Sequence, residues 1–277
     1  MMSKCVKNKS LVFVFDLDKT IGYFTQIAIF VEGIENYLKR KLNKKELYKI
    51  FDVFPEIFRP DTMSIFKYIK NVKLKLKCVK VLIYTNNMGP KSWVYDIKNY
   101  IESKLKYKLF DRTIAAWKVD NKIYEKNRTT HEKTVKDLLK CGKIKSTANI
   151  VFLDDINHPY MIDKSVKYIK VRAYKHDIKF ELMSNRFLKT PIGKLIKKTE
   201  HDKFKKNMLE FSRDDPLGFK YSVSNISSRK NYKKEILSQL KSFVKENKHN
   251  ISRKKRIKRI KRKNKTKKKG GFLSHFL

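Results

Sequence analysis

Polar residues that directly follow three short apolar runs are the part of this sequence best suited to chemistry. Each run is four or five residues long and ends in acids or a hydroxyl: residues 11–15 lead to Asp16 and Asp18, residues 81–84 to Thr85, and residues 150–153 to Asp154 and Asp155. Carboxylates are ligands that Mg²⁺ prefers, and a carboxylate is also a known nucleophile in phosphoryl transfer. The pattern predicts a site where a cation and a phosphate ester meet.

Phosphate esters hydrolyse very slowly unaided, so a protein must neutralise the phosphoryl oxygens, place a nucleophile in line and protonate the leaving oxygen. We interpret Asp16 as the nucleophile that forms an aspartyl-phosphate, and Asp18 as the general acid and then the general base. Mg²⁺ would be bound by Asp16, the backbone carbonyl of Asp18 and Asp154, with Asp155 as a further candidate ligand. The sequence therefore predicts a magnesium-dependent phosphoric monoester hydrolase.

The three apolar runs read as buried strands within an alternation of strands and helices that extends over about 170 residues. We expect helices at 25–58, from Asp61 or Thr62 to Tyr68, at 90–105 and at 133–140, with further strands at 112–117 and 167–174. This alternation predicts an α/β fold with a doubly wound parallel sheet. Ligands bind such sheets beyond the carboxyl ends of the strands, which is where the polar residues fall.

The string Asp-Leu-Asp-Lys-Thr at residues 16–20 resembles the first motif, DxDx[TV], of the haloacid-dehalogenase-like (HAD) phosphatases. Thr85 resembles their second motif, a hydroxyl that binds the phosphoryl group, and Asp154-Asp155 resembles their acidic fourth motif. The resemblance covers about residues 10–175 and implies a HAD-like, Rossmannoid fold. It also makes Thr20 a candidate substrate-binding residue.

The third motif of this superfamily is a lysine that balances charge around the phosphate, and two residues are candidates for it. Lys133 opens the predicted helix, 21 residues before Asp154, which is the commoner arrangement in the superfamily. Lys136, followed by Asp137 and Leu138, resembles the lysine of the FCP/SCP branch. Three residues apart, the two would share one helical face. We favour Lys133 and retain Lys136 as a substrate-binding candidate.

Within the superfamily the chain is most similar to the FCP/SCP (NLI-interacting-factor-like) branch. Arg59-Pro60 before a helix, together with the paired acids at 154 and 155, carries this resemblance, although Lys19 stands where the branch has Glu. The connection from Asp18 to Thr85 is short for a large cap. The resemblance thus implies a minimal cap, an open site and a phosphoserine or phosphothreonine protein as substrate.

Two other functions compete with this one. Thr85-Asn86 is similar to a Thr-Asn pair of polynucleotide 3′-phosphatases, which makes Asn86 a substrate-binding candidate and a nucleic-acid 3′-end phosphatase an alternative. A catalytically idle nucleic-acid-binding module is the other alternative. The intact acids at positions 16, 18 and 154 speak against an idle module.

Positive charge dominates the chain, with 68 Lys and Arg residues against 27 Asp and Glu and a net charge of +41. Between residues 253 and 269, 13 of 17 residues are Lys or Arg. A block of like charge this dense predicts a disordered tail that binds polyanions such as nucleic acid. Such tails resemble those of proteins from large DNA viruses. We divide the chain into a phosphatase domain at 10–180, a polar, partly helical extension at 181–250 and a basic tail at 251–277.

Three cysteines without a CxxC pair predict reduced thiols rather than a disulfide framework or a zinc site. No apolar run approaches the roughly 18 residues that a membrane span needs, and no secretory signal precedes Leu11. We therefore expect an intracellular protein, nuclear or cytoplasmic, or in the virion or host cell if it is viral. Its oligomeric state is not predicted.

Overall fold

The computed structural model describes residues 10–213 and 233–247, and its centre is a five-stranded sheet in which every pair of neighbours is parallel. The strand order is β3-β2-β1-β6-β7, with bounds β1 (Leu11–Phe15), β2 (Val79–Tyr84), β3 (Arg112–Ile114), β6 (Asn149–Asp154) and β7 (Val166–Lys170). Helices cover both faces of this sheet, so its central strand is apolar throughout rather than alternating. The predicted α/β class with a parallel sheet is confirmed.

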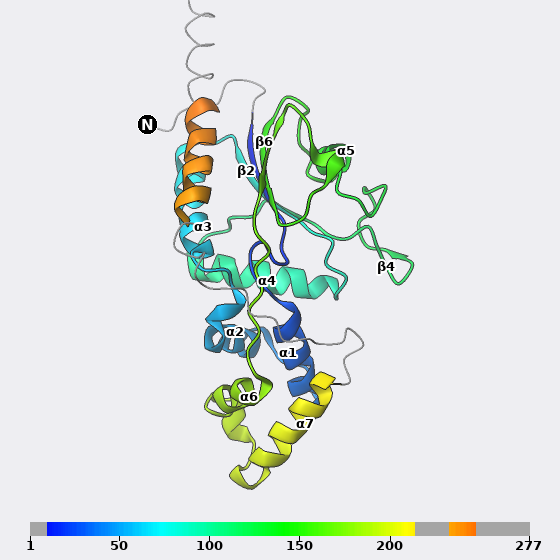
Figure 1. Cartoon of the computed structure of the whole chain (residues 1–277), viewed down its shortest axis with the longest axis vertical. Coiled ribbons are helices and arrows are strands. Elements are labelled where there is room, and N and C mark those ends of the chain that lie inside the picture. Colours follow the sequence, from blue (N-terminus) through cyan, green and yellow to red (C-terminus); the bar gives the residue numbers. More distant parts are fainter. Residues whose placement is uncertain (1–9, 214–232, 248–277) are drawn as a thin grey trace, which may run out of the picture.

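Helices of the described part flank this sheet, and others lie beyond one end of it (Figure 1). They are α1 (Thr25–Leu38), α2 (Lys44–Val53), α3 (Thr62–Lys75), α4 (Lys91–Leu105), α5 (Val135–Cys141), α6 (Phe180–Leu188), α7 (His201–Arg213) and a helix at 233–247. A small antiparallel hairpin, β4 (Lys118–Val119) and β5 (Lys122–Ile123), projects from the sheet. None of these helices is long and apolar enough to cross a membrane.

The two faces of β1 contact different helices. Phe13 lies edge-on to Phe243 of the 233–247 helix, at 5.7 Å between ring centroids, and Phe15 lies edge-on to Phe66 of α3 at 5.2 Å. Val12 and Val14 point the other way, into a smaller core that includes residues of α5. Burial of β1 on both sides holds the residues that follow it in one position.

Four helices, α1, α2, α6 and α7, pack together beyond the carboxyl end of the sheet (Figure 1). Phe30 of α1 is at their centre and contacts Phe54, Phe180 and Phe187. Residues 180–213 therefore pack on the segment that follows β1, and the 233–247 helix packs on the sheet. The region predicted as a polar extension contributes apolar side chains to the same core.

Several element boundaries differ from the predicted ones for local reasons. The strand predicted at 112–117 ends at Ile114, whose carbonyl accepts from the Thr85 N–H at 3.0 Å, because the next carbonyl, that of Ala115, accepts from the Arg128 guanidinium instead. The helix predicted at 133–140 begins at Val135, because the Thr134 hydroxyl caps it by accepting from the Asp137 N–H at 3.0 Å. The strand predicted at 167–174 ends at Lys170.

The cysteines differ from expectation as well. Cys78 is disulfide-bonded, so the prediction of reduced thiols is wrong for it. Cys141 is a free, buried thiol on α5. The predicted basic tail at 251–277 lies outside the described residues.

Candidate active site

The loop after β1 folds back on itself and presents Asp16 and Asp18 at the carboxyl edge of the sheet. Lys19 takes a left-handed conformation (φ 58°), and its N–H donates to the Gly22 carbonyl at 2.6 Å. A Cβ on Gly22 would lie 2.4 Å from the Ile57 carbonyl oxygen, so only glycine fits this approach. The turn is therefore dictated by local sequence as well as by the buried strand before it.

Arg59 holds this loop from outside. Its Nε donates to the Thr20 carbonyl at 2.7 Å, and Nη2 donates to the carbonyls of Lys19 and Arg172. The guanidinium is buried, so these charge-assisted bonds replace its hydration. The Arg59-Pro60 pair noted in the sequence thus positions the loop that carries the acids.

Lys133 joins two of the three acidic positions. Its side chain is 2% exposed, and Nζ lies 2.5 Å from Asp16 Oδ1 and 2.7 Å from Asp154 Oδ2. Lys133 precedes α5 instead of opening it, in extended backbone before the Thr134 cap. The prediction that it shares a helical face with Lys136 is therefore wrong: Lys136 is on the helix and exposed.

Arg128 fixes the segment that leads to Lys133, and the sequence analysis did not single it out. It is 2% exposed, and it donates to the carbonyls of Ala115 at 2.9 Å and His131 at 2.9 Å. Its guanidinium also lies over the Tyr84 ring at 4.9 Å. An arginine among so many basic residues gives no sequence signal of such a role.

Three carboxylates could hold a cation here. One oxygen each of Asp16, Asp154 and Asp155 lies within 4.8 Å of the others. Thr20, itself buried, orients Asp155: its hydroxyl donates to Asp155 Oδ1 and accepts from the Asp155 N–H, both at 3.1 Å. The carboxylate of Asp18 is not in this group. An all-oxygen set of this kind suits a hard divalent cation.

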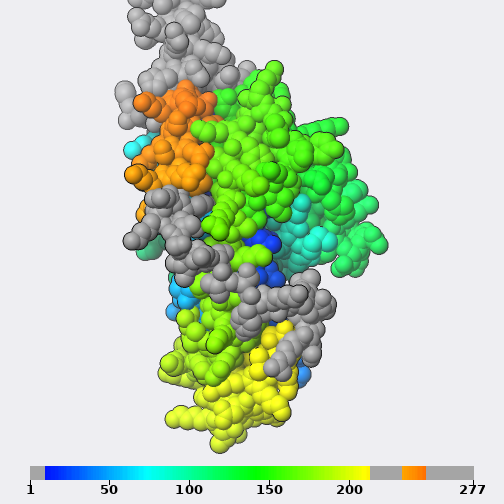
Figure 2. Space-filling model, viewed as in Figure 1, coloured from blue at the N-terminus to red at the C-terminus, as the bar shows by residue number. Residues whose placement is uncertain are grey.

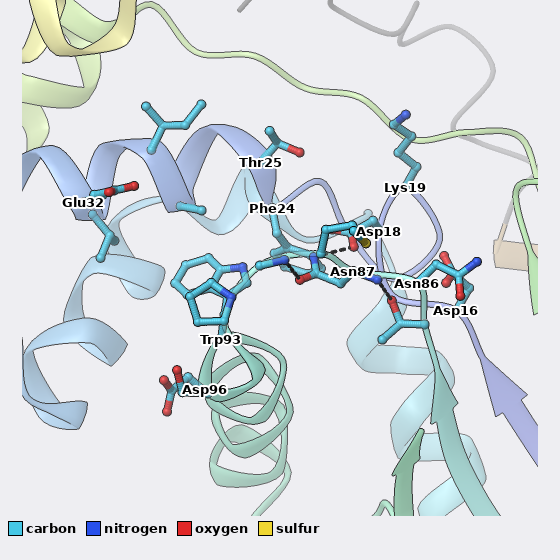
Figure 3. A pocket seen from close by; sticks show the side chains of 18 of the residues that line it. Asp16, Asp18, Lys19, Phe24, Thr25, Glu32, Asn86, Asn87, Trp93 and Asp96 are labelled. Atoms are coloured by element: carbon cyan, nitrogen blue, oxygen red, sulfur yellow. Dashed lines mark hydrogen bonds between the residues drawn. The ribbon is translucent and has the colours of Figure 1, made fainter. Parts of the chain in front are cut away.

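Asn87 links the Asp18 and Thr85 sides of the site (Figure 3). Its Nδ2 donates to Asp18 Oδ2 at 2.7 Å, and its N–H donates to the Thr85 hydroxyl at 3.0 Å. Asn86, the residue predicted to bind substrate, is exposed, and its amide donates to the His131 carbonyl at 3.0 Å. The Asn-Asn pair was visible in the sequence, but the strand end decides which of the two faces the acids.

The acids differ in their affinity for protons. Burial raises the pKa of Asp16 to about 7, and the charges of Asp154 and Asp18 add to this shift against the opposing effect of Lys133. Burial also raises the pKa of Asp18, in part offset by the Asn87 hydrogen bond. For Asp154 burial is outweighed by His158 and Lys133, which lower its pKa. A raised pKa favours the protonated form of Asp18, which is the form that a general acid requires.

His158 is a further residue that the sequence analysis did not assign to the site. It is buried, and its Nε2 lies 3.3 Å from Asp154 Oδ2, outside good hydrogen-bond geometry, while Nδ1 lies 3.8 Å from Glu132. Its position four residues after Asp154 is the only sequence signal for this contact. We assign it a supporting contact to the Asp154 carboxylate.

These residues form one end of a cleft of about 1010 Å³ that continues between α1, α2 and α4. In the space-filling view, the blue residues that follow β1 are visible between the sheet and the yellow-green helical part (Figure 2). The helices between β1 and β2 therefore build a wall of the cleft instead of leaving the acids on an open edge. Thr85, Lys133 and the acids line the end at the sheet, and Trp93 and Asp96 line the other.

Comparisons of the chain with protein-family models, with curated proteins and with solved structures gave no match. The site described above is therefore interpreted from its own geometry.

Proposed function

We propose that the protein is a magnesium-dependent phosphatase of the HAD-like type that hydrolyses a phosphomonoester through an aspartyl-phosphate on Asp16. The observation that carries the proposal is the convergence of Asp16, Thr85 and Asp154 from three neighbouring strands, β1, β2 and β6, with the buried Lys133 bonded to two of them. Lys133 contacts two acids, Asp16 and Asp154, at the carboxyl edge of the parallel sheet, where folds of this class bind their ligands.

In the first step a carboxylate oxygen of Asp16 attacks phosphorus, and the bond between phosphorus and the ester oxygen breaks. Asp18, whose pKa burial raises, gives its proton to the departing oxygen. In the second step water attacks the phosphorus of the aspartyl-phosphate and loses a proton to Asp18. Inorganic phosphate leaves, and the Asp16 carboxylate is restored.

The other residues bind the transferring group. Lys133 would carry positive charge to the phosphoryl oxygens, and the Thr85 hydroxyl would donate to one of them. Asp16, Asp154 and Asp155 would hold Mg²⁺, which supplies further neutralisation of phosphoryl charge when bound. Asn87 orients Asp18 toward the ester oxygen through its 2.7 Å hydrogen bond.

The substrate class that we propose is a protein phosphorylated on serine or threonine. A cleft of about 1010 Å³ has room for more than a phosphate group, and its far end contains apolar and aromatic side chains. The exposed Asn86, engaged with a backbone carbonyl, gives no support to the nucleic-acid 3′-end alternative.

Hydrolysis of an aryl phosphate by the full chain tests the proposal. We expect turnover that requires Mg²⁺ and is lost in Asp16→Asn, while Asp202→Asn, a change at a 98% exposed carboxylate of α7, leaves it unchanged. Turnover that survives in Asp16→Asn would sink the proposed nucleophile. Absence of turnover on an aryl phosphate, a phosphopeptide and a 3′-phosphorylated oligonucleotide would favour the idle binding module.

A further inference from the structure

We infer that the far half of the cleft selects a basic phosphopeptide, in which a lysine or arginine stands about three residues from the phosphorylated serine or threonine. This inference rests on the proposed function and names the substrate that the site accepts. It is carried by two carboxylates, Glu32 on α1 and Asp96 on α4, that line the cleft away from the cation-binding acids.

Glu32 and Asp96 enter the cleft from different walls. In Figure 3, Glu32, Trp93 and Asp96 all lie on the side of Phe24 that is away from Asp16. Apolar residues of α1, including Ile29, line the same part. A half-buried indole that lines the same part of the cleft as two carboxylates suits a lysine or arginine, because the methylene stem can pack on the ring while the charged head reaches the acids.

No basic side chain of the described residues contacts either of these two acids directly. Glu35, one turn further along α1, accepts from Lys41 Nζ at 2.7 Å and from the Leu42 N–H at 3.0 Å. By contrast, Glu32 and Asp96 have no hydrogen bond or ion pair with any residue in the described ranges 10–213 and 233–247. Lys41 acts on Glu32, and Lys44 on α2 acts on Asp96, only through space. Two unpaired carboxylates on an otherwise very basic protein favour a cation from outside.

The spacing along α1 sets where that cation must be. Thr25, at the start of α1, lines the cleft near Asp18, and Glu32 follows seven residues later, which is about 10 Å along a helix axis. An extended peptide covers about 3.3–3.6 Å per residue. A basic residue roughly three positions from the phosphorylated one would therefore place its charge between Glu32 and Asp96.

The same acids oppose a nucleic-acid substrate. A polynucleotide would bring further phosphates into the cleft beside the reacting one, and Glu32 and Asp96 would repel them. Repulsion of that kind excludes one partner as effectively as attraction selects another. The cleft charge thus favours the peptide even though the chain as a whole is basic.

The experiment uses three phosphoserine peptides that differ only at the third residue on either side of the phosphoserine, which is lysine, norleucine or glutamate. We expect the full chain to hydrolyse the lysine peptide about tenfold more efficiently, in kcat/KM, than the norleucine peptide and to disfavour the glutamate peptide. In Glu32→Gln/Asp96→Asn this order should collapse to within about twofold. The matched control Asp202→Asn/Glu210→Gln, which removes the same charge from α7, should keep it.

Binding of the labelled peptides to Asp16→Asn, followed by fluorescence anisotropy, separates this inference from the proposed chemistry because it needs no turnover. Failure of the full chain to hydrolyse an aryl phosphate would refute the proposed function. Equal binding of the three peptides to Asp16→Asn would refute the inference alone. Preference that persists in Glu32→Gln/Asp96→Asn would also overturn it. So would tighter lysine-peptide binding after removal of residues 250–277, since the occupant would then be the chain's own basic segment.

Discussion

The cleft and the C-terminal segment of this protein carry opposite charges. Seven carboxylates and three lysines line the cleft, whereas 13 of the 17 residues between 253 and 269 are Lys or Arg. Charge that is spread along a chain attracts polyanions without regard to their detail, because phosphate contacts alone carry no sequence information. Charge that is placed in a cleft determines which groups enter it. The net charge of +41 is therefore a poor guide to the substrate.

The acidic cleft also has an energetic consequence that the basic segment lacks. Lys133 contacts only Asp16 and Asp154, and burial together with the charges of Asp154 and Asp18 raises the pKa of Asp16 to about 7. Sites that concentrate like charge for catalysis commonly lower the stability of the protein.

Replacing the buried Lys133 should have the largest effect. In Lys133→Met, Asp16 and Asp154 lose the group that lies 2.5 and 2.7 Å from them, and phosphoryl charge has no buried counter-ion. We expect kcat to fall by about 10³-fold and the protein to lose about 3–5 kcal/mol of stability at neutral pH. Steady-state kinetics and urea denaturation measure both. Lys136→Met, at the exposed lysine of α5, is the matched control, and equal losses in the two variants would contradict the assignment.

Asp18→Asn should separate the general-acid role of Asp18 from its general-base role, because only the first depends on the leaving group of the substrate. The variant cannot protonate the departing oxygen, so we expect a loss of about 10²–10⁴-fold with a phosphoserine peptide. An aryl phosphate with an acidic phenol needs little protonation, and its first step should suffer far less. Comparing burst and steady-state rates on the two substrates checks this. Equal losses in the burst rates would show that Asp18 is not the acid.

Loosening the loop after β1 should affect rate more than binding. Arg59→Lys keeps a positive charge but cannot reach the carbonyls of Thr20, Lys19 and Arg172 together. Because misplacement of the acids slows the chemical step, we expect kcat to fall by roughly 10–100-fold with KM nearly unchanged. A change confined to KM would show that Arg59 binds substrate instead.

Asp16→Asn should make the metal-free protein more stable while abolishing turnover. A carboxyl whose folded pKa of about 7 exceeds its ordinary value costs stability once it must ionise, so the parent loses stability as pH rises from about 4 through 7. The variant avoids this loss, and we expect a gain of about 1–3 kcal/mol at pH 8. Thermal unfolding with and without Mg²⁺ measures it. A variant less stable than the parent at pH 8 without metal would contradict the predicted repulsion.

Deleting residues 250–277 should change activity least. We expect aryl phosphate hydrolysis to stay within about twofold, while affinity for a single-stranded oligonucleotide falls and loses its steep salt dependence. Filter binding at two salt concentrations provides the comparison. Unchanged affinity after the deletion would show that polyanions bind elsewhere.

The sheet and the principal site were predictable from sequence because they depend on short-range patterns. β1 has the predicted bounds, and its position next to β2 and β6 follows from apolar runs that only a sheet covered on both faces can bury. Those runs also place Asp16, Thr85 and Asp154 at one edge. The position of Lys133 was predictable on the single further condition that the segment before α5 approaches the same edge.

The rest depends on contacts between distant segments. α6 and α7 were not predicted, because lysines obscure the spacing of Phe204 and Met208, and their burial against α1 is visible only in the folded chain. Similarly, Asn87 rather than Asn86 faces Asp18 because of the way β2 ends. The clamp that Arg59 forms joins residues 113 positions apart. Local propensity carries no information on such pairs.

Trapping the phosphorylated enzyme identifies the residue that attacks phosphorus. The full chain is mixed with an aryl phosphate and Mg²⁺, quenched in acid within one turnover and reduced with borohydride, which converts an aspartyl-phosphate to homoserine. Peptide mass spectrometry should then find homoserine at position 16, absent without Mg²⁺ and absent in Asp16→Asn. Burst release of the phenol with no modified residue, or modification at a residue other than Asp16, would contradict the proposed mechanism.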